Sequence, residues 1–202
     1  MGLKALIFDF GGVLVRTGDR SLRAGWEQRL KLAGGQAEYI VFGGETGWDV
    51  QLGTIGDAEH WRRLQARWGL DDEALARFRE DFFAGDELDR DLVAYLGRLR
   101  ARYHVGLLSN AGDNARQFFA EKHAILDCFD SVTISAEEGV MKPEARIFRI
   151  ALARAGVEPA EALLVDDALA NVEGARQIGM QALHFTEPVA ARRQLALLTG
   201  VD

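Results

Sequence analysis

The stretch LIFDFGGVLV, Leu6–Val15, decides the fold. Its apolar residues predict a buried β-strand near the start of the chain, but Asp9 interrupts the run and Gly11 and Gly12 follow. Burying an unpaired carboxylate is costly, so this aspartate needs partners where it leaves the strand. We therefore expect Asp9 at the rim of a sheet, facing other polar groups.

The second half of the chain alternates short apolar runs with segments of helical periodicity. The expected strands are Val105–Leu108, Ser131–Ile134, Ala162–Val165 and Met180–Phe185, and the expected helices are Arg90–Tyr103, Asn114–His123, Glu144–Ala155 and Asn171–Ile178. This alternation predicts βαβ units. Because the strands are apolar on both sides, we expect an α/β fold with a Rossmann-like parallel sheet covered by helices on both faces.

Residues 16–85 have a different pattern. Amphipathic helices are expected at Ser21–Ala33, Asp57–Trp68 and Asp71–Ala84, without a recurring strand pattern. We predict that residues 16–85 form a small all-helical cap inserted into an α/β core of residues 1–15 and 86–202. All four tryptophans fall in this segment, and we expect them to form its interior rather than a substrate or partner surface: Trp26, Trp48, Trp61 and Trp68.

Composition restricts the partners. The formal charge of −7 argues against a nucleic-acid or anionic-membrane binder, because both require a basic face. No apolar run approaches the roughly 18 residues of a membrane span. The lone Cys128 allows no intramolecular disulfide, which suits a reducing cytoplasm. The sequence does not indicate an oligomeric state.

Polar residues follow three of the expected strands. They are Asp9, Ser109 and the pair Asp166 and Asp167, and ligands bind at the carboxyl ends of strands in open parallel sheets. Carboxylates that converge repel one another unless a cation intervenes. Mg²⁺ suits one or two carboxylates together with a substrate phosphate.

Further residues fit a phosphorylated substrate. Ser109 and Asn110 can donate hydrogen bonds to phosphate oxygens, and Lys142 can neutralise negative charge. A carboxylate, a cation, a hydroxyl and a lysine suit phosphoryl transfer through an aspartyl-phosphate.

Four motifs occur in order along the chain: FDFGGVL around Asp9, LLSN ending at Ser109 and Asn110, SAEEGVMKPEARIF around Lys142, and LLVDDALANVEGA around Asp167. With them the chain resembles the haloacid dehalogenase-like superfamily, in the branch with a helical cap after the first strand. The stretch LGTIGDAEHW, Leu52–Trp61, is similar to the turn that opens a cap helix in that branch. The resemblance covers nearly the whole chain.

The resemblance implies a nucleophile and a metal site. Asp9 matches the nucleophile, which is also a metal ligand, and the backbone carbonyl of Gly11 and the carboxylate of Asp167 match the other ligands. Asp166 matches a residue that orients the lysine or a metal-bound water, and Asn171 takes a supporting position behind the metal.

The resemblance also implies a phosphate site. Ser109 and Asn110 match the phosphate-binding turn, and Lys142 matches the cation that steadies both nucleophile and phosphoryl group. Gly12 permits the tight turn that brings backbone donors toward phosphate. Asp9, Lys142 and Ser109 are therefore the expected catalytic residues.

One position departs from the family pattern. The usual motif has a second aspartate two residues after the nucleophile, as general acid and base, and here Gly11 replaces it. Loss of such a group typically costs roughly 10²–10⁴-fold in rate. Asp166, Asp113 or Asp19 are possible substitutes as the proton donor.

Three functions remain open. The first is a Mg²⁺-dependent phosphatase acting on a small phosphorylated metabolite with a good leaving group, such as a sugar-1-phosphate, aryl phosphate or acyl phosphate. The second is a 2-haloacid dehalogenase-type hydrolase, although that branch usually has Tyr at the position of Gly11 and lacks paired carboxylates such as Asp166 and Asp167. The third is a catalytically weak protein that binds a phosphorylated ligand or a partner.

Overall fold

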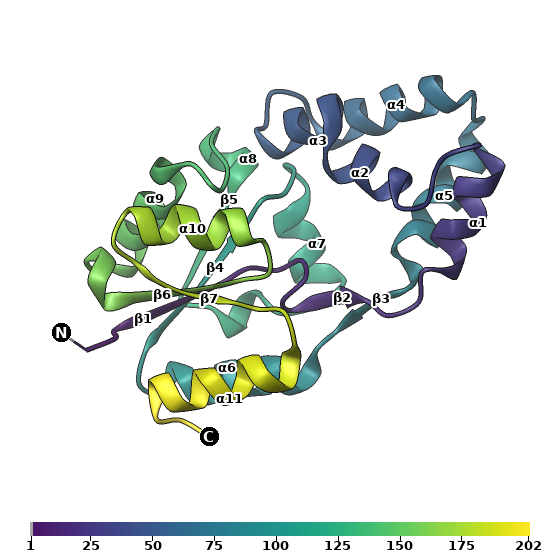
Figure 1. Cartoon of the computed structure of the whole chain (residues 1–202). Helices are drawn as coiled ribbons and strands as arrows, with labels where there is room; N and C mark the ends of the chain where they lie inside the picture. Colours follow the sequence, from purple (N-terminus) through teal and green to yellow (C-terminus); the bar gives the residue numbers. More distant parts are fainter. Residues whose placement is uncertain (1) are drawn as a thin grey trace.

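A parallel five-stranded sheet forms the centre of one lobe (Figure 1). The structure is a computed structural model that describes residues 2–202, apart from the side chain of Glu45. The strand order is β5-β4-β1-β6-β7. The strands are β1 (Ala5–Phe8), β4 (His104–Ser109), β5 (Ser131–Ile134), β6 (Ala162–Asp166) and β7 (Gln181–His184). The central β1 pairs with β4 and β6, and its residues are at most 1% exposed.

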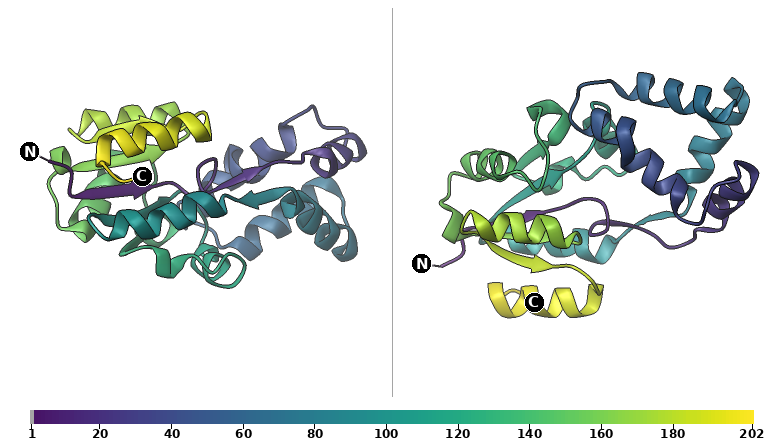
Figure 2. Two further views of the ribbon diagram at one scale, coloured as in Figure 1. Left: turned by 90° about the horizontal axis from the view of Figure 1, so that it is seen from below. Right: turned by 45° about the horizontal axis from the view of Figure 1, so that its top comes forward.

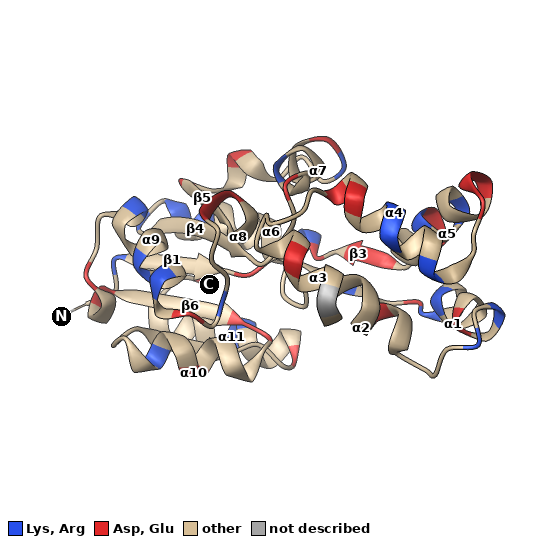
Figure 3. Cartoon of the chain, turned by 90° about the horizontal axis from the view of Figure 1, so that it is seen from above, with Lys and Arg blue, Asp and Glu red and all other residues tan. Residues whose placement is uncertain are grey.

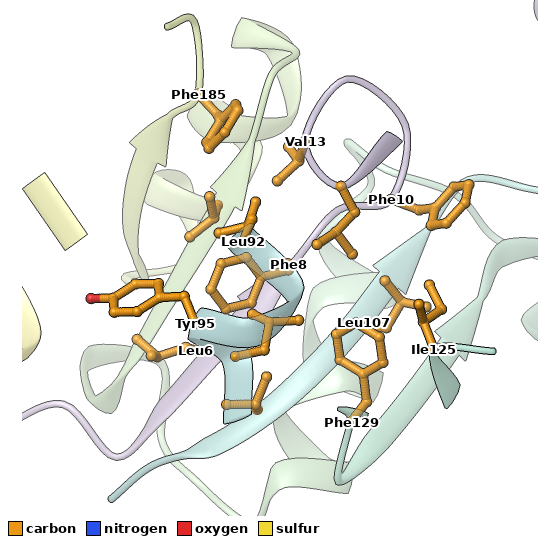
Figure 4. Packing of buried hydrophobic residues seen from close by; sticks show 14 of the residues in the cluster. Leu6, Phe8, Phe10, Val13, Leu92, Tyr95, Leu107, Ile125, Phe129 and Phe185 are labelled. Carbon is orange, nitrogen blue, oxygen red and sulfur yellow. The ribbon is translucent and has the colours of Figure 1, made fainter. Parts of the chain in front are cut away.

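Helices cover both faces of the sheet. Alternate residues of β1 enter different interiors, since side chains in a strand alternate between the two faces. Leu6 and Phe8 pack into a large cluster with α6, α7 and α11 (Figure 4), whereas Ala5 and Ile7 pack toward α9 and α10. The helices are α6 (Arg90–Arg100), α7 (Ala115–Glu121), α8 (Ser135–Glu138), α9 (Ala145–Ala155), α10 (Leu169–Gln177) and α11 (Pro188–Thr199). The predicted Rossmann-like α/β fold is confirmed.

Five helices form a second lobe beside the sheet (Figure 2), which we call the helical lobe. They are α1 (Ser21–Arg29), α2 (Gln36–Phe42), α3 (Gly44–Gln51), α4 (Asp57–Trp68) and α5 (Asp72–Ala84). An antiparallel ribbon of β2 (Val15–Thr17) and β3 (Asp86–Leu88) joins the two lobes. The interior of the helical lobe is largely apolar and includes two of the tryptophans: Trp26, Ala37, Ile40, Val41, Trp61, Leu64, Phe78 and Phe82.

Some local features differ from the expectations. The first strand ends at Phe8, directly before Asp9 as expected, but the helices α2 and α3 were not predicted. These two helices have only seven and eight residues, too few for a clear helical periodicity. Trp48 on α3 is 48% exposed, so it is not an interior residue.

Charges of opposite sign lie close together on the helical lobe (Figure 3). On α4, Glu59 accepts hydrogen bonds from both Arg62 and Arg63, at the spacings where helical side chains meet. None of the helices in residues 2–202 has the length and apolar character required to cross a bilayer.

Candidate active site

Polar side chains gather at one edge of the sheet. Asp9 follows β1, Ser109 ends β4 and Asp166 ends β6, and these three strands are neighbours in the parallel sheet. Parallel strands bring their carboxyl ends to the same edge, so residues far apart in sequence converge there. All three residues are buried, with exposed fractions of 8%, 4% and 0%.

A buried lysine links two of the carboxylates. Lys142 lies in the segment between α8 and α9 and is 2% exposed. Its Nζ lies 2.8 Å from Oδ1 of Asp9 and 2.7 Å from Oδ2 of Asp166, and it also donates to the carbonyl of Leu108 at 3.0 Å. The three protons of the ammonium group therefore have three partners, which fixes its position.

Both carboxylate oxygens of Asp166 accept hydrogen bonds. While Oδ2 accepts from Lys142, Oδ1 accepts from the backbone N–H of Ala168 and from Nδ2 of Asn171, both at 2.9 Å. Through Oδ2, Asp166 therefore contacts the ammonium group of Lys142. This geometry also gives Asn171 a definite contact, because its amide steadies Asp166.

Burial and charge shift the pKa values at this edge. Burial raises the pKa of Asp9 to about 7, with Lys142 opposing and Asp166 reinforcing the shift. Partial burial and the charge of Asp166 raise the pKa of Asp167. For Lys142, burial lowers the pKa, but the ion pairs with Asp9 and Asp166 outweigh it, so the pKa is raised and the ammonium stays charged.

The acidic residues fit a divalent cation. Asp9, Asp166 and Asp167 each offer a carboxylate oxygen, and these atoms lie within 4.8 Å of one another. Among the described residues, the ammonium group of Lys142 is the one cation that pairs with this cluster, so three carboxylates share a single positive charge. Because both oxygens of Asp166 already accept from protein donors, Asp9 and Asp167 are the better ligands. Such a set of hard oxygen donors suits Mg²⁺.

The turn after Asp9 is shaped to receive Asp167. Gly12 has a φ of +71°, and a Cβ atom there would lie 2.0 Å from Oδ2 of Asp167. Only glycine allows this approach, because any side chain would displace the carboxylate. This brings Asp167 against the turn that carries the Gly11 carbonyl, the third predicted ligand.

Asn110 makes a contact that sequence reasoning missed. The side chain was predicted to bind phosphate, but it bonds instead to the main chain of Lys142: Oδ1 accepts from the N–H at 2.8 Å and Nδ2 donates to the carbonyl at 2.9 Å. No signal in the sequence indicated this pairing of residues 32 positions apart. Ser109 lies beside it at the end of β4, as expected.

No neighbouring atom explains why Gly11 lacks a side chain. A Cβ atom there would meet nothing within 4 Å among the described residues, so the position has room for the first atom of a side chain. The three suggested substitutes have other partners: Asp166 bonds to Lys142, Asp113 accepts from the N–H of Asp57 at 3.0 Å, and Asp19 accepts from the N–H of Ser21. The hydrogen bonds from Ser21 also lower the pKa of Asp19, which makes it a poor proton donor.

The helical lobe touches the rim of this site. Asp113 lies three residues beyond Asn110 and accepts from the N–H of Asp57, the first residue of α4. Gly53 approaches the main chain of α8, where a Cβ atom would lie 2.4 Å from the carbonyl oxygen of Ala136. The turn between α3 and α4 therefore rests on α8 and on the loop that follows Asn110.

Several known proteins are similar to this chain in sequence and in fold. Over 198 residues, 98% of this chain and 97% of the relative, it is 28% identical to the sesquiterpene phosphatase astK of Aspergillus oryzae. It is 27% identical to D-ribitol-5-phosphate phosphatase of Bacteroides thetaiotaomicron, over 97% of this chain and 98% of the relative. A HAD family enzyme from Bacteroides thetaiotaomicron, solved as its magnesium complex, superposes with a TM-score of 0.72 at 25% identity, over 91% of this chain and 93% of that one.

A family model extends this likeness along most of the chain. Residues 3–179 match the model for haloacid dehalogenase-like hydrolases. This stretch includes all four motifs and the whole helical lobe, and it ends before β7 and α11. The chain therefore belongs to the haloacid dehalogenase-like hydrolases.

Proposed function

We propose that the protein is a Mg²⁺-dependent phosphatase that transfers the phosphoryl group of a small metabolite to Asp9. The observation that carries the proposal is the ion pair of Asp9 with the buried Lys142, beside the acidic pair Asp166 and Asp167. The two phosphatase relatives, aligned over nearly their whole length, support phosphoric monoester hydrolysis. In this proposal residues 16–85 act as a cap over a core of residues 1–15 and 86–202.

Asp9 is the nucleophile of the proposed reaction. One carboxylate oxygen bonds to phosphorus while the bond from phosphorus to the leaving oxygen breaks, and water then attacks the aspartyl-phosphate and regenerates the carboxylate. Oδ1 of Asp9 is fixed by the N–H of Phe10 and by Lys142, at 2.7 and 2.8 Å. These contacts leave Oδ2 as the attacking atom.

The remaining residues bind phosphate and metal. Ser109 and the backbone of the turn at Asn110 and Gly12 donate to phosphate oxygens, while Lys142 compensates their charge. Asp9, Asp167 and the Gly11 carbonyl are the proposed metal ligands. When bound there, Mg²⁺ supplies positive charge for the phosphoryl oxygens of the transition state.

Gly11 restricts the substrate. Because Asp166, Asp113 and Asp19 all have other partners, we infer that the leaving oxygen takes its proton from solvent or leaves without one. Aryl phosphates, acyl phosphates and sugar-1-phosphates tolerate this better than simple alkyl esters. The same observation favours a second candidate function, a weakly catalytic protein that binds a phosphorylated ligand.

Hydrolysis of an aryl phosphate tests the proposal. We expect turnover with Mg²⁺, loss of turnover with a chelator, and loss in Asp9→Asn but not in the control Asp91→Asn, whose side chain is 87% exposed. Halide release from a 2-haloacid without metal would instead favour a dehalogenase. Binding of inorganic phosphate without turnover of any ester would favour the ligand-binding protein.

A further inference from the structure

The carboxamide of Asn110 holds both main-chain polar groups of Lys142. Its Oδ1 accepts from the lysine N–H and its Nδ2 donates to the lysine carbonyl, at 2.8 and 2.9 Å. We propose that Asn110 is a positioning residue, which sets the place of the catalytic lysine. The catalytic consequence rests on the proposed phosphatase activity, whereas the structural consequence can be measured without it.

Lys142 needs an anchor outside its own segment. It lies between α8 and α9, outside the strands and helices, and its side chain is 2% exposed. Buried main-chain N–H and carbonyl groups require partners, and here Asn110 supplies both. A lysine side chain has four flexible methylenes, so a fixed main chain is needed to place its ammonium reproducibly.

The same strand end also holds the ammonium group. The carbonyl of Leu108 accepts from Nζ of Lys142 at 3.0 Å, two residues before Asn110. Leu108 and Ser109 end β4, and Asn110 follows directly. Leu108 and Asn110 therefore hold the two ends of the lysine, and Ser109 is the residue between them in the chain. The spacing between phosphate-binding hydroxyl and ammonium is set by this single stretch of chain.

This role differs in its consequences from direct phosphate binding. A misplaced ammonium weakens stabilisation of the transition state, so kcat falls while KM changes little. Misplacement of a catalytic group by about 1 Å can cost roughly 100-fold, and we expect a decrease in kcat on the order of 10- to 100-fold for Asn110→Ala. A ground-state phosphate ligand would instead raise KM at unchanged kcat.

The rate of lysine acetylation in the native protein reports how firmly the ammonium group of Lys142 is held in its buried place. The chain has four lysines, Lys4, Lys31, Lys122 and Lys142, whose modification can be followed separately by mass spectrometry. We expect Lys142 to react slowest in the unaltered protein. In Asn110→Ala its rate should rise on the order of tenfold, because two main-chain hydrogen bonds lose their partner, while the other lysines react as before.

Two further variants control this experiment. Asn114→Ala removes an exposed asparagine of the same loop and should alter neither Lys142 acetylation nor kcat. Asn110→Asp retains an acceptor for the lysine N–H and loses the donor, so acetylation should be intermediate; it replaces Asn110→Ala if that variant does not fold.

The outcomes separate the two proposals. Faster acetylation of Lys142 together with a lower kcat supports the positioning role. Unchanged acetylation in Asn110→Ala, or a raised KM at unchanged kcat, overturns it. If the unaltered protein hydrolyses no phosphate ester, the proposed function fails, and the acetylation rates still decide whether Asn110 holds the lysine.

Discussion

The interiors of the two lobes are built differently. At the sheet edge, the buried Lys142, Asp166 and Asn171 bond to one another or to the main chain. In the helical lobe, the interior consists mainly of aromatic and aliphatic side chains, and both ring nitrogens of the buried His60 lack a partner among the described residues. In the proposed function the sheet lobe carries the chemistry on a network of buried polar contacts, whereas the helical lobe is held together mainly by apolar packing.

Restoring an acid at Gly11 has the largest expected effect. Since a Cβ atom has room there, Gly11→Asp should fold and supply the missing general acid. We expect turnover of alkyl phosphates to rise by up to roughly 10²–10⁴-fold, and that of aryl phosphates by less. Steady-state kinetics on a matched alkyl and aryl pair would check this. An equal gain on both would show that leaving-group protonation is not what the protein lacks.

Removing the buried lysine should destabilise the sheet lobe. In Lys142→Met, Asp9 and Asp166 lose their common cation, and breaking a buried ion pair from one side costs about 3–5 kcal/mol of unfolding free energy. The loss should grow from pH 5 to pH 8, because burial already raises the pKa of Asp9, and without the ammonium group its ionisation in the folded protein is opposed further. Urea unfolding in metal-free buffer measures this loss of unfolding free energy. The control is Lys31→Met, at an exposed lysine. A loss equal to that of the control contradicts the account.

Replacing His60 should stabilise the protein instead of destabilising it. Its ring nitrogens are buried without a hydrogen bond of good geometry to a described residue, so His60→Leu should raise the unfolding free energy by about 1–2 kcal/mol. Burial lowers the pKa of His60, so below about pH 6.5 the unfolded chain takes up a proton that the folded one resists, and stability falls. Between pH 7.5 and pH 5.5, the unfolding free energy measured with urea should fall less in His60→Leu than in the unaltered protein. An unchanged pH dependence would show that His60 does not titrate on unfolding.

The smallest effect is expected where the lobes meet. Asp113 caps α4 from the other lobe, because Gly56 precedes that helix without a side-chain cap, whereas Asp71 caps α5 locally. Each replacement by Ala should cost about 1 kcal/mol, typical for a lost cap. Hydrogen exchange should accelerate at the start of the capped helix in each variant, but only Asp113→Ala should also expose the turn between α3 and α4. Equal exposure in both variants would argue against a contact between the lobes in solution.

Short-range patterns predicted the sheet edge well. Asp9, Ser109 and Asp166 could be placed together because each follows an apolar run, and parallel strands end at one edge. The partners of Asn110 could not be predicted, since the sequence shows which groups a side chain carries but not which distant main chain it meets. For the same reason the contact of Asp113 with α4, 56 positions away, emerged only from the fold.

The proposed assignment of the chemistry to the sheet lobe depends on Asp9 accepting the phosphoryl group. Rapid quenching of the enzyme mixed with an aryl phosphate and Mg²⁺, followed by peptide mass spectrometry, tests this directly. We predict a burst of product equal to the enzyme concentration, because Gly11 cannot activate water, together with one phosphoryl group on the peptide containing Asp9. Product release that is linear from time zero, with no phosphoryl group on Asp9 during turnover, would contradict the account.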